Sequence, residues 1–256
     1  KLDAEKLNED FFNFIFRNEG DAESVAKSTG LEKEKIDEIK KSFDYWYPLD
    51  WRCSASELIG NHLTFMVFHH TALFPADKWP RGIVAFGMGL LEGQKMSSSK
   101  GNVVLLKEAI DKFGADVVRL FLMSNAEPWQ DFDWREKEVV GAQKALSKFK
   151  ALADSLDGME EGKETNIDRW LISKLQNTKG TVNISLEGFQ TRKALQAGFF
   201  EVFPILRWYE RRGGKNKKIL LSFLNEWTRL LAPFTPYIAE EVWSKIGKGF
   251  VLDAEY

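Results

Sequence analysis

Residues 95–102 of this chain read Lys95-Met96-Ser97-Ser98-Ser99-Lys100-Gly101-Asn102. They follow an apolar run from Ile83 to Leu91 and a short polar turn, so we expect a strand that leads into a loop. Hydroxyls, two lysines and a glycine in one loop can surround a polyphosphate, because backbone N–H groups and ammonium groups then act on it together. The same composition also suits a solvated polar loop, so the order of the residues has to distinguish the two interpretations.

The composition is that of a folded protein with a substantial core. Apolar residues make up 44% and aromatic residues 13% of the 256 residues, so disorder is not expected. The formal net charge is −2, so any contact with RNA has to come from a local basic patch. The single cysteine, Cys53, excludes an internal disulfide and a Cys-based zinc site, and the three histidines lack the spacing of metal ligands. We therefore expect no metal site.

No part of the sequence predicts a membrane segment. The longest apolar stretch, from Leu63 to Phe74, is interrupted by His69-His70 and is too short to span a bilayer. The first residues, Lys1-Leu2-Asp3, are neither a signal peptide nor a usual initiator. We therefore expect a cytoplasmic protein, and a chain that is part of something longer.

Helical periodicity dominates residues 3–46. Apolar side chains recur on one face, and Asp21 is expected to cap the second helix. Residues 44–52 are expected to be extended, because Pro48 disfavours helical dihedral angles at Tyr47. No residue type in this segment points to catalysis.

One helix and one strand are expected between this segment and the loop. Ser54 or Ser56 is expected to cap a helix that runs to about Phe74. Residues 83–91 predict a buried strand or hairpin. Its Gly87 indicates either the close approach of another group to the backbone or a bulge, and the sequence does not separate these two alternatives.

Helices and one packed loop, residues 127–134, are expected beyond the loop. Residues 105–113 and 115–123 predict two short helices separated by Gly114, and the spacing of Asp116 and Arg119 allows an ion pair. Longer amphipathic segments then predict a helical bundle. These segments are residues 134–156, 166–187, 189–211, 215–231 and 235–247.

Two polar side chains near the start of the predicted 54–74 helix are candidate binding residues. Glu57 lies in the first turn, where the helix dipole favours an anion, and a carboxylate at a strand-to-helix junction can accept two ribose hydroxyls. A capping acid is the alternative for Glu57. His62 follows five residues later, and by itself it is expected to be a packed, hydrogen-bonded histidine.

Basic residues gather where the third long helix ends. Arginines stand on both sides of Trp208 and Tyr209, and a lysine-rich stretch follows at residues 215–218. Basic side chains between aromatic ones are compatible with RNA contact, and a solvated helix end is the alternative. The candidate RNA-binding residues are Arg207, Arg211, Arg212, Lys217 and Lys218.

The order of residues in the loop resembles the KMSKS signature of class I aminoacyl-tRNA synthetases, the mobile loop that helps ATP react with an amino acid. Ser98 stands where this family usually has its second lysine. Residues 45–52 and 61–65 closely resemble the archaeal and eukaryotic-type leucyl-tRNA synthetases, and residues 231–243 resemble the anticodon-binding domain of the Leu/Ile/Val/Met group. The resemblance covers essentially the whole chain.

The resemblance implies an ATP-dependent reaction in which leucine forms leucyl-adenylate and is then transferred to tRNA(Leu), with Mg²⁺ accompanying ATP. Glu57 would bind the adenosine ribose, although Ala55 replaces a glycine of the family pattern, and His62 would line the leucine side of the site. Gly87 and Met88 would hold adenine through the backbone, next to Met96 of the loop. The residues that would face the phosphates are Lys95, Ser97, Ser98, Ser99 and Lys100.

The family's His-Ile-Gly-His element is not in this sequence. The resemblance therefore implies the second half of a Rossmann-like α/β catalytic domain followed by an all-α bundle, a predominantly helical fold. It also implies that the chain is inactive alone and that an N-terminal half is its partner, on a separate chain if the gene is split. Two other functions stay open: a non-catalytic RNA- or protein-binding paralogue, and a class I enzyme for lysine or methionine.

The same resemblance divides the chain into three parts. Residues 1–104 are expected to form the partial catalytic domain with its N-terminal helices and the loop. Residues 105–133 are expected to form a connecting helical segment that contacts the tRNA stem. Residues 134–256 are expected to form the anticodon-binding bundle.

Overall fold

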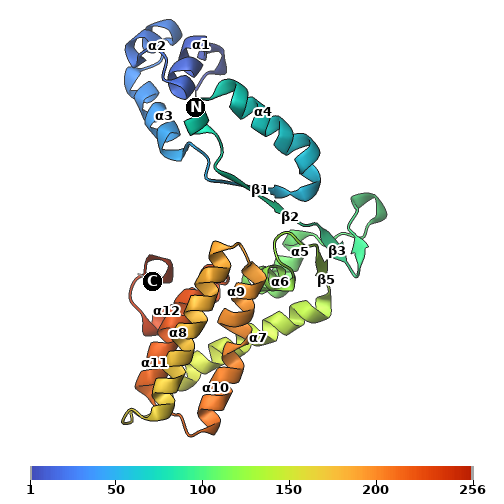
Figure 1. Cartoon of the computed structure of the whole chain (residues 1–256), viewed down its shortest axis with the longest axis vertical. Coiled ribbons are helices and arrows are strands. Elements are labelled where there is room, and N and C mark those ends of the chain that lie inside the picture. Colours follow the sequence, from blue (N-terminus) through green and yellow to red (C-terminus); the bar gives the residue numbers. More distant parts are fainter. Residues whose placement is uncertain (1, 255–256) are drawn as a thin grey trace. The chain divides into compact units, whose positions relative to one another are not determined.

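The computed structural model describes residues 2–254, except for the side chains of Ser98 and Asp157. Internal contacts divide the chain into two compact units, Lys1–Phe86 and Gly87–Tyr256, which are described separately below. Helices predominate in the described residues, and the strands there form two small sheets (Figure 1). This arrangement confirms the predicted class, α/β plus all-α.

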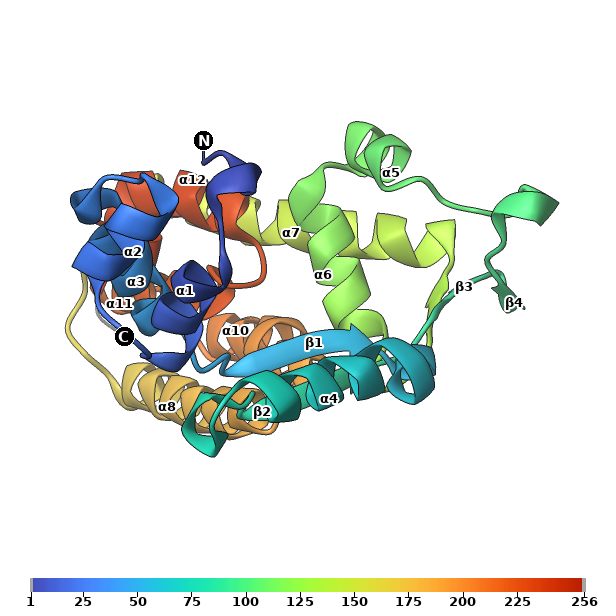
Figure 2. The same cartoon turned by 90° about the horizontal axis from the view of Figure 1, so that it is seen from above.

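The first unit opens with helices around a small hydrophobic core. They are grouped together in both views of the chain (Figures 1 and 2). Asp21 caps the second helix by accepting hydrogen bonds from the backbone N–H groups of Glu23 and Ser24, as predicted. The buried side chains that hold the helices together are Phe11, Ile15, Ala22, Val25 and Ile36. The helices are α1 (Glu9–Phe12), α2 (Ala22–Thr29) and α3 (Lys33–Trp46).

The prediction of an extended segment from residue 44 was wrong at its start. α3 continues to Trp46; Tyr47 adopts extended dihedral angles, and Trp51 and Arg52 lie in a β-strand. The steric effect of Pro48 reaches one residue back and no further. Lys40 and Asp44 form an ion pair at helical i, i+4 spacing, which favours continuation of the helix.

A βαβ unit completes the first unit. β1 (Trp51–Ala55) and β2 (Gly82–Phe86) pair in parallel, with Trp51 opposite Gly82, and α4 (Thr64–Leu73) lies between them in sequence. Neither Ser54 nor Ser56 caps a helix: Ser54 is buried within β1, and the helical turns begin at Ser56 with no side-chain hydrogen bond at their N-terminus. The strand therefore continues to the residue where the sequence predicted a cap.

The second unit opens with a small mixed sheet. β3 (Gly89–Leu91) pairs antiparallel with β4 (Gln94–Lys95) and parallel with β5 (Phe132–Trp134). The prediction of a buried strand or hairpin at residues 83–91 was wrong, because β2 and β3 belong to different sheets and neither is fully buried. Gly87 separates them, since its N–H donates to Pro128 O and an added Cβ would lie 2.2 Å from Gln130 O.

The rest of the second unit is the predicted helical bundle. Its central contact is aromatic: Phe149 meets Trp227 edge to face, with ring centroids 4.8 Å apart. The third long segment is interrupted by a π-helical turn, Gln196–Phe200. Within the described residues, no helix is long and apolar enough to cross a membrane. The helices are α5 (Leu106–Phe113), α6 (Ala115–Asn125), α7 (Glu136–Ser155), α8 (Asn166–Glu187), α9 (Thr191–Leu195), α10 (Val202–Arg211), α11 (Lys217–Leu231) and α12 (Pro236–Ile246).

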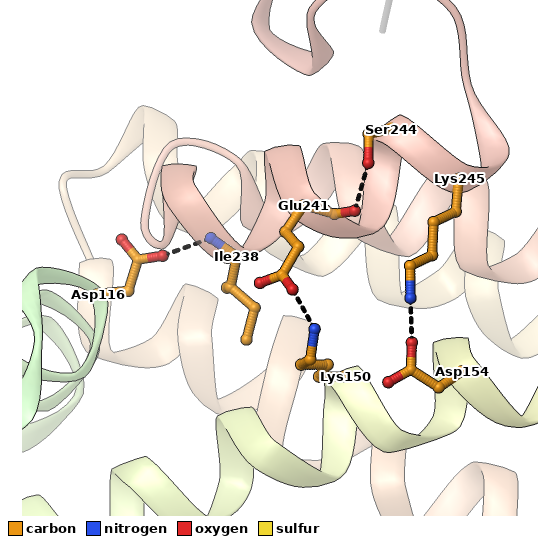
Figure 3. Close-up of polar contacts among 7 residues, drawn as sticks. All are labelled: Asp116, Lys150, Asp154, Ile238, Glu241, Ser244 and Lys245. Carbon is orange, nitrogen blue, oxygen red and sulfur yellow. Dashed lines mark hydrogen bonds and ion pairs between the residues drawn. The ribbon is translucent and has the colours of Figure 1, made fainter.

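Polar side chains of α6 hold the turn between α11 and α12. Asp116, whose spacing to Arg119 would allow an ion pair, instead accepts a hydrogen bond of 2.6 Å from Ile238 N (Figure 3). Arg119 donates to the carbonyl oxygens of Pro233 (2.7 Å) and Phe234 (2.9 Å). Burial raises the pKa of Asp116 although this N–H stabilises its ionised form. Both side chains thus bind a segment more than 110 residues away in sequence.

Two ion pairs join α12 to α7. Lys150 pairs with Glu241, and Asp154 pairs with Lys245 one helical turn further along (Figure 3). All four side chains are partly exposed, so each pair is expected to add well under about 1 kcal/mol. The attachment of α12 therefore depends mainly on its buried residues and on α6.

A buried hydrogen-bond network closes the far end of the bundle. The Tyr209 hydroxyl donates to Asp168 and accepts from Asn216 N at 3.3 Å. Asp168 also accepts from Thr165 N (2.8 Å) and Thr165 Oγ1 (2.7 Å) at the start of α8. Burial opposes ionisation of Asp168, but these hydrogen bonds outweigh it and lower its pKa. Burial and the hydrogen bond to Asp168 raise the pKa of Tyr209 to about 12.

Replacing Tyr209 by Phe is expected to destabilise the chain by about 1–3 kcal/mol, because buried partners of the hydroxyl lose a hydrogen bond. Urea denaturation of the parent and the variant measures this difference. Tyr237→Phe is the control, since Tyr237 is 73% exposed and its hydroxyl is expected to contribute less than about 0.5 kcal/mol. Equal stability of the parent and Tyr209→Phe would contradict the assigned role of this network.

The contribution of Asp168 is expected to depend on pH. Because its folded-state pKa is lowered, its stabilising effect is present above the unfolded pKa of about 3.9 and is lost as the pH falls through the folded value. The difference in stability between the parent and Asp168→Asn should therefore shrink in acid. Denaturation series at neutral and acidic pH test this, and a difference that grows in acid would contradict it.

Candidate functional site

Asn102 closes the loop of residues 95–102 into a ring. Its Oδ1 accepts a hydrogen bond of 3.0 Å from Ser97 N, and its Nδ2 donates one of 3.1 Å to Lys95 O. Inside the ring, Lys100 N donates to Ser97 O at 3.1 Å, within a short 3-10 turn. No role for Asn102 was predicted from the sequence; an Asn directly after a turn glycine was the signal that could have identified it.

The loop presents cationic and hydroxyl side chains to solvent, and Met96 anchors it to the hydrophobic core. Lys95, Ser99 and Lys100 are exposed, and the Ser97 and Ser99 hydroxyls are 2.9 Å apart. Met96 is partly buried and packs against the main hydrophobic core of the second unit. The Ser98 side chain lies outside the described part of the structure. The loop can therefore offer several hydrogen-bond donors to an anion, while Met96 holds the loop against the core.

Two aspartates of the β5 segment hold the backbone that precedes the loop. Asp131 Oδ1 accepts from Met88 N at 2.7 Å, and Asp133 Oδ1 accepts from Gly93 N at 2.9 Å. Asp133 also forms an ion pair of 2.7 Å with Arg135. The hydrogen bonds from Gly93 and Arg135 lower the pKa of Asp133, so this carboxylate is ionised at neutral pH.

The backbone N–H groups of the two residues expected to hold adenine are engaged within the chain. Met88 N donates to Asp131, and Gly87 N donates to Pro128 O at 2.8 Å. Met88 O accepts from Phe132 N at 3.1 Å. The close approach indicated by Gly87 is thus made by the chain itself. A carbonyl oxygen has two lone pairs and can accept a second hydrogen bond. The backbone atoms of Gly87 and Met88 that can still bind adenine are therefore their carbonyl oxygens.

Glu57 and His62 belong to the first unit, whereas the loop belongs to the second. Glu57 lies two residues after the end of β1, in the first helical turn, and is exposed. His62 Nε2 lies 3.0 Å from the Arg52 guanidinium. Because a guanidinium only donates, Nε2 is the acceptor and the neutral ring carries its proton on Nδ1. His62 is therefore hydrogen-bonded, as expected, but exposed rather than packed.

The predicted RNA-binding residues lie around the connection from α10 to α11. Arg207, Arg211 and Lys218 are exposed. Arg212 lies over the Trp208 ring, 4.7 Å from its centroid, and the other neighbour of Trp208 is Trp170 of α8, at 4.2 Å between centroids. The Arg212 guanidinium is thus partly engaged. Within the described residues, no group of three or more His, Cys, Asp or Glu side chains could hold a metal ion.

Two family models match the chain. Residues 25–148 match tRNA synthetases class I (M), which includes β1, β2 and the loop. Residues 168–256 match the anticodon-binding domain of tRNA ligase, which includes the helices from α8 to α12. The first match contains Glu57 and the loop, and the second contains Arg207 and Lys218.

Curated relatives match almost the whole chain. It is 48% identical over 254 residues to the leucine–tRNA ligase of Methanopyrus kandleri, a match that covers 98% of this chain and 27% of that protein. It is 47% identical over 269 residues to the leucine–tRNA ligase of Pyrococcus furiosus, covering 100% of this chain and 28% of that protein. The chain thus spans little more than a quarter of the length of these relatives.

A solved structure supports the same relationship. The ternary complex of Agrobacterium radiobacter K84 agnB2 LeuRS-tRNA-LeuAMS matches with a TM-score of 0.69 and 28% sequence identity. The match covers 80% of this chain and 28% of that one. Sequence motifs, fold and relatives agree, and the chain therefore belongs to the class I aminoacyl-tRNA synthetases, in their leucine–tRNA ligase branch.

Proposed function

We propose that this chain supplies the phosphate-facing loop and the tRNA-binding bundle of a cytoplasmic leucyl-tRNA synthetase. The whole enzyme would activate leucine with ATP to leucyl-adenylate and transfer the leucyl group to tRNA(Leu). The observation that carries the proposal is the Asn102-closed loop, which belongs to the same compact unit as the bundle. One unit would then contact both ATP and tRNA.

In the proposed reaction the chain contributes positioning and charge, and no protein nucleophile is needed. Lys95 and Lys100 would face the phosphates as cations, with hydroxyl donors from Ser97 and Ser99. The donor set of the loop fits a triphosphate, because it holds cations and hydroxyls and its described residues include no carboxylate. Mg²⁺ would enter with ATP, bound through the phosphate oxygens.

Two residues of the first unit are also proposed to bind substrate groups. Glu57, at the carboxyl end of β1, would accept hydrogen bonds from the ribose hydroxyls. His62 would line the leucine pocket, where Arg52 fixes its tautomer. We further propose the three-part division at residues 1–104, 105–133 and 134–256, and an N-terminal half of the enzyme as the partner that completes the site.

A non-catalytic paralogue is the second candidate function. Ser98 in place of the family's second lysine favours it, since a cation is lost where phosphate charge would be stabilised. An enzyme for lysine or methionine is less well supported, because the relatives described above are leucine–tRNA ligases.

The 256-residue chain alone is expected not to catalyse leucine-dependent pyrophosphate exchange. The phosphate donors of a His-Ile-Gly-His element are not in this sequence, and each preorganised donor typically contributes about 2.7–4 kcal/mol to transition-state stabilisation. An exchange assay with a full-length leucine–tRNA ligase as the positive control tests this. Exchange by the chain at a rate near that of the control would contradict the proposal.

ATP is expected to bind the chain weakly, through the loop. Replacing Lys95 and Lys100 by Ala should lower the affinity about tenfold or more, equivalent to about 1.4 kcal/mol. Asn102→Ala should also lower it, because the ring opens. Calorimetry measures both effects, with Lys107→Ala as the control for an exposed cation outside the loop. Tight, stoichiometric binding that survives the double substitution would exclude the loop as the ATP site.

Binding of tRNA is expected to be electrostatic and to involve the α10–α11 connection. For about four phosphate contacts, the slope of log affinity against log salt concentration should be about −3 to −4. Replacing Arg211, Arg212, Lys217 and Lys218 by Ala should flatten this slope and weaken binding to all tRNAs alike. Filter binding over a salt series is the test.

The control for this experiment is the pair Lys27→Ala and Lys41→Ala, which removes exposed charge from the first unit. A slope left unchanged by the quadruple substitution would place the RNA-binding surface elsewhere. A strong preference for leucine tRNA would show that the bundle discriminates between tRNAs, which the proposal does not expect.

A further inference from the structure

A groove in the second unit has no role in the function proposed so far. It has a volume of about 640 Å³ and lies between the end of α6, one face of α7 and the continuous helical segment from α9 to α10. Three cations line it: Lys144 and Lys148 of α7 and Arg192 of α9. Phe200 and Phe203 form an apolar side next to them. The groove could therefore accept an anion that also presents apolar surface.

Within the described part of the chain, the charged groups of these three side chains have no carboxylate partner, although the Arg192 backbone N–H donates to Glu127 Oε2 at 3.2 Å. Glu138, the carboxylate that lines the same groove, accepts a hydrogen bond of 3.0 Å from Asn125 instead. Lys144 and Lys148 stand at i, i+4 on one helix face, where like charges destabilise a helix by about 0.2–0.5 kcal/mol. No contact among the described residues stabilises the folded chain in a way that would explain the clustering of these three cations.

Gly141 is a second, independent feature of the same groove. It lies inside α7, where glycine is about 0.8–1 kcal/mol less favourable than alanine. A Cβ added there would meet no atom within 4 Å, so internal packing does not require the glycine. Gly198 differs, because its Cβ would lie 2.8 Å from Val182. Gly141 precedes Lys144 and Lys148 by three and seven residues, which places all three on one face of α7.

We infer that this groove binds the sugar–phosphate backbone of RNA. The inference rests on the proposed tRNA-binding function and names a surface for it. The cations would contact phosphates, the phenylalanines would pack against ribose or base, and Gly141 would let the backbone approach α7 closely. Arg192 and Arg211 are separated by about 28 Å of helix, so the groove is distinct from the α10–α11 connection.

The test is binding of an archaeal leucine tRNA transcript to the 256-residue chain over a salt series. Lys144→Ala with Lys148→Ala should weaken binding and reduce the magnitude of the salt slope by about 1.4–1.8, for two lost phosphate contacts. Gly141→Leu should weaken binding about tenfold with the slope unchanged, because it blocks the approach without removing charge. Leucine also favours the helix, so the melting temperature should not fall.

Gly180→Leu is the matched control. Gly180 is also an exposed glycine inside a long helix, α8, with no atom within 4 Å of an added Cβ. It is outside the lining of the groove. The substitution should leave RNA affinity and its salt slope at the parent values. Lys27→Ala with Lys41→Ala is the control for the loss of two charges.

Three results would overturn the inference. If the groove variants bind as the parent does while the α10–α11 variant loses binding, the groove is not the RNA surface and the proposed function stands. If poly-glutamate competes as well as the tRNA transcript, the groove takes an acidic protein. If the parent chain binds no tRNA in low salt, both the inference and the tRNA-binding part of the proposed function fail.

Discussion

The second unit depends on the contact of α6 with the turn that joins α11 and α12. Arg119 satisfies the carbonyl oxygens of Pro233 and Phe234, and Asp116 satisfies the N–H of Ile238 at the start of α12. Backbone groups left without partners in a partly buried position are costly, and Pro233 and Pro236 lack the N–H groups that could pair carbonyl oxygens within this turn. Since α6 follows the loop of residues 95–102 in sequence and α12 is the last long helix of the bundle, this contact joins the loop-bearing part of the unit to the end of the bundle.

The loop depends on a second set of polar contacts. Asn102 closes the ring by bonding backbone groups on both sides, and Asp131 and Asp133 hold the strand and turn that lead into it. These side chains bind backbone groups and leave the lysines and serines to face solvent. A loop held in this way would lose less conformational freedom on binding the triphosphate proposed for it, because its backbone is already preorganised.

The helices could be predicted from the sequence, because amphipathic periodicity is a local property. The loop was identified from the order of its residues. Apolar patterning failed at residues 83–91, where Gly87 indicated a close approach or a bulge but not that the run is divided between two sheets. The role of Asn102 and the partners of Asp116 and Arg119 were also missed. Those partners lie more than 110 residues away along the chain, and helical spacing carries no information about them. Long-range hydrogen bonds therefore mark the limit of the sequence analysis.

The central claim is that the loop-bearing sheet and the bundle form one cooperative unit joined by Arg119 and Asp116. Hydrogen–deuterium exchange of the parent and Arg119→Ala tests it most directly, with Lys150→Ala as the control for a partly exposed ion pair. The account predicts that Arg119→Ala speeds exchange together in α12, α6 and the β3–β5 pair, while Lys150→Ala has little effect. Faster exchange confined to residues 236–246, with the sheet as protected as in the parent, would contradict it.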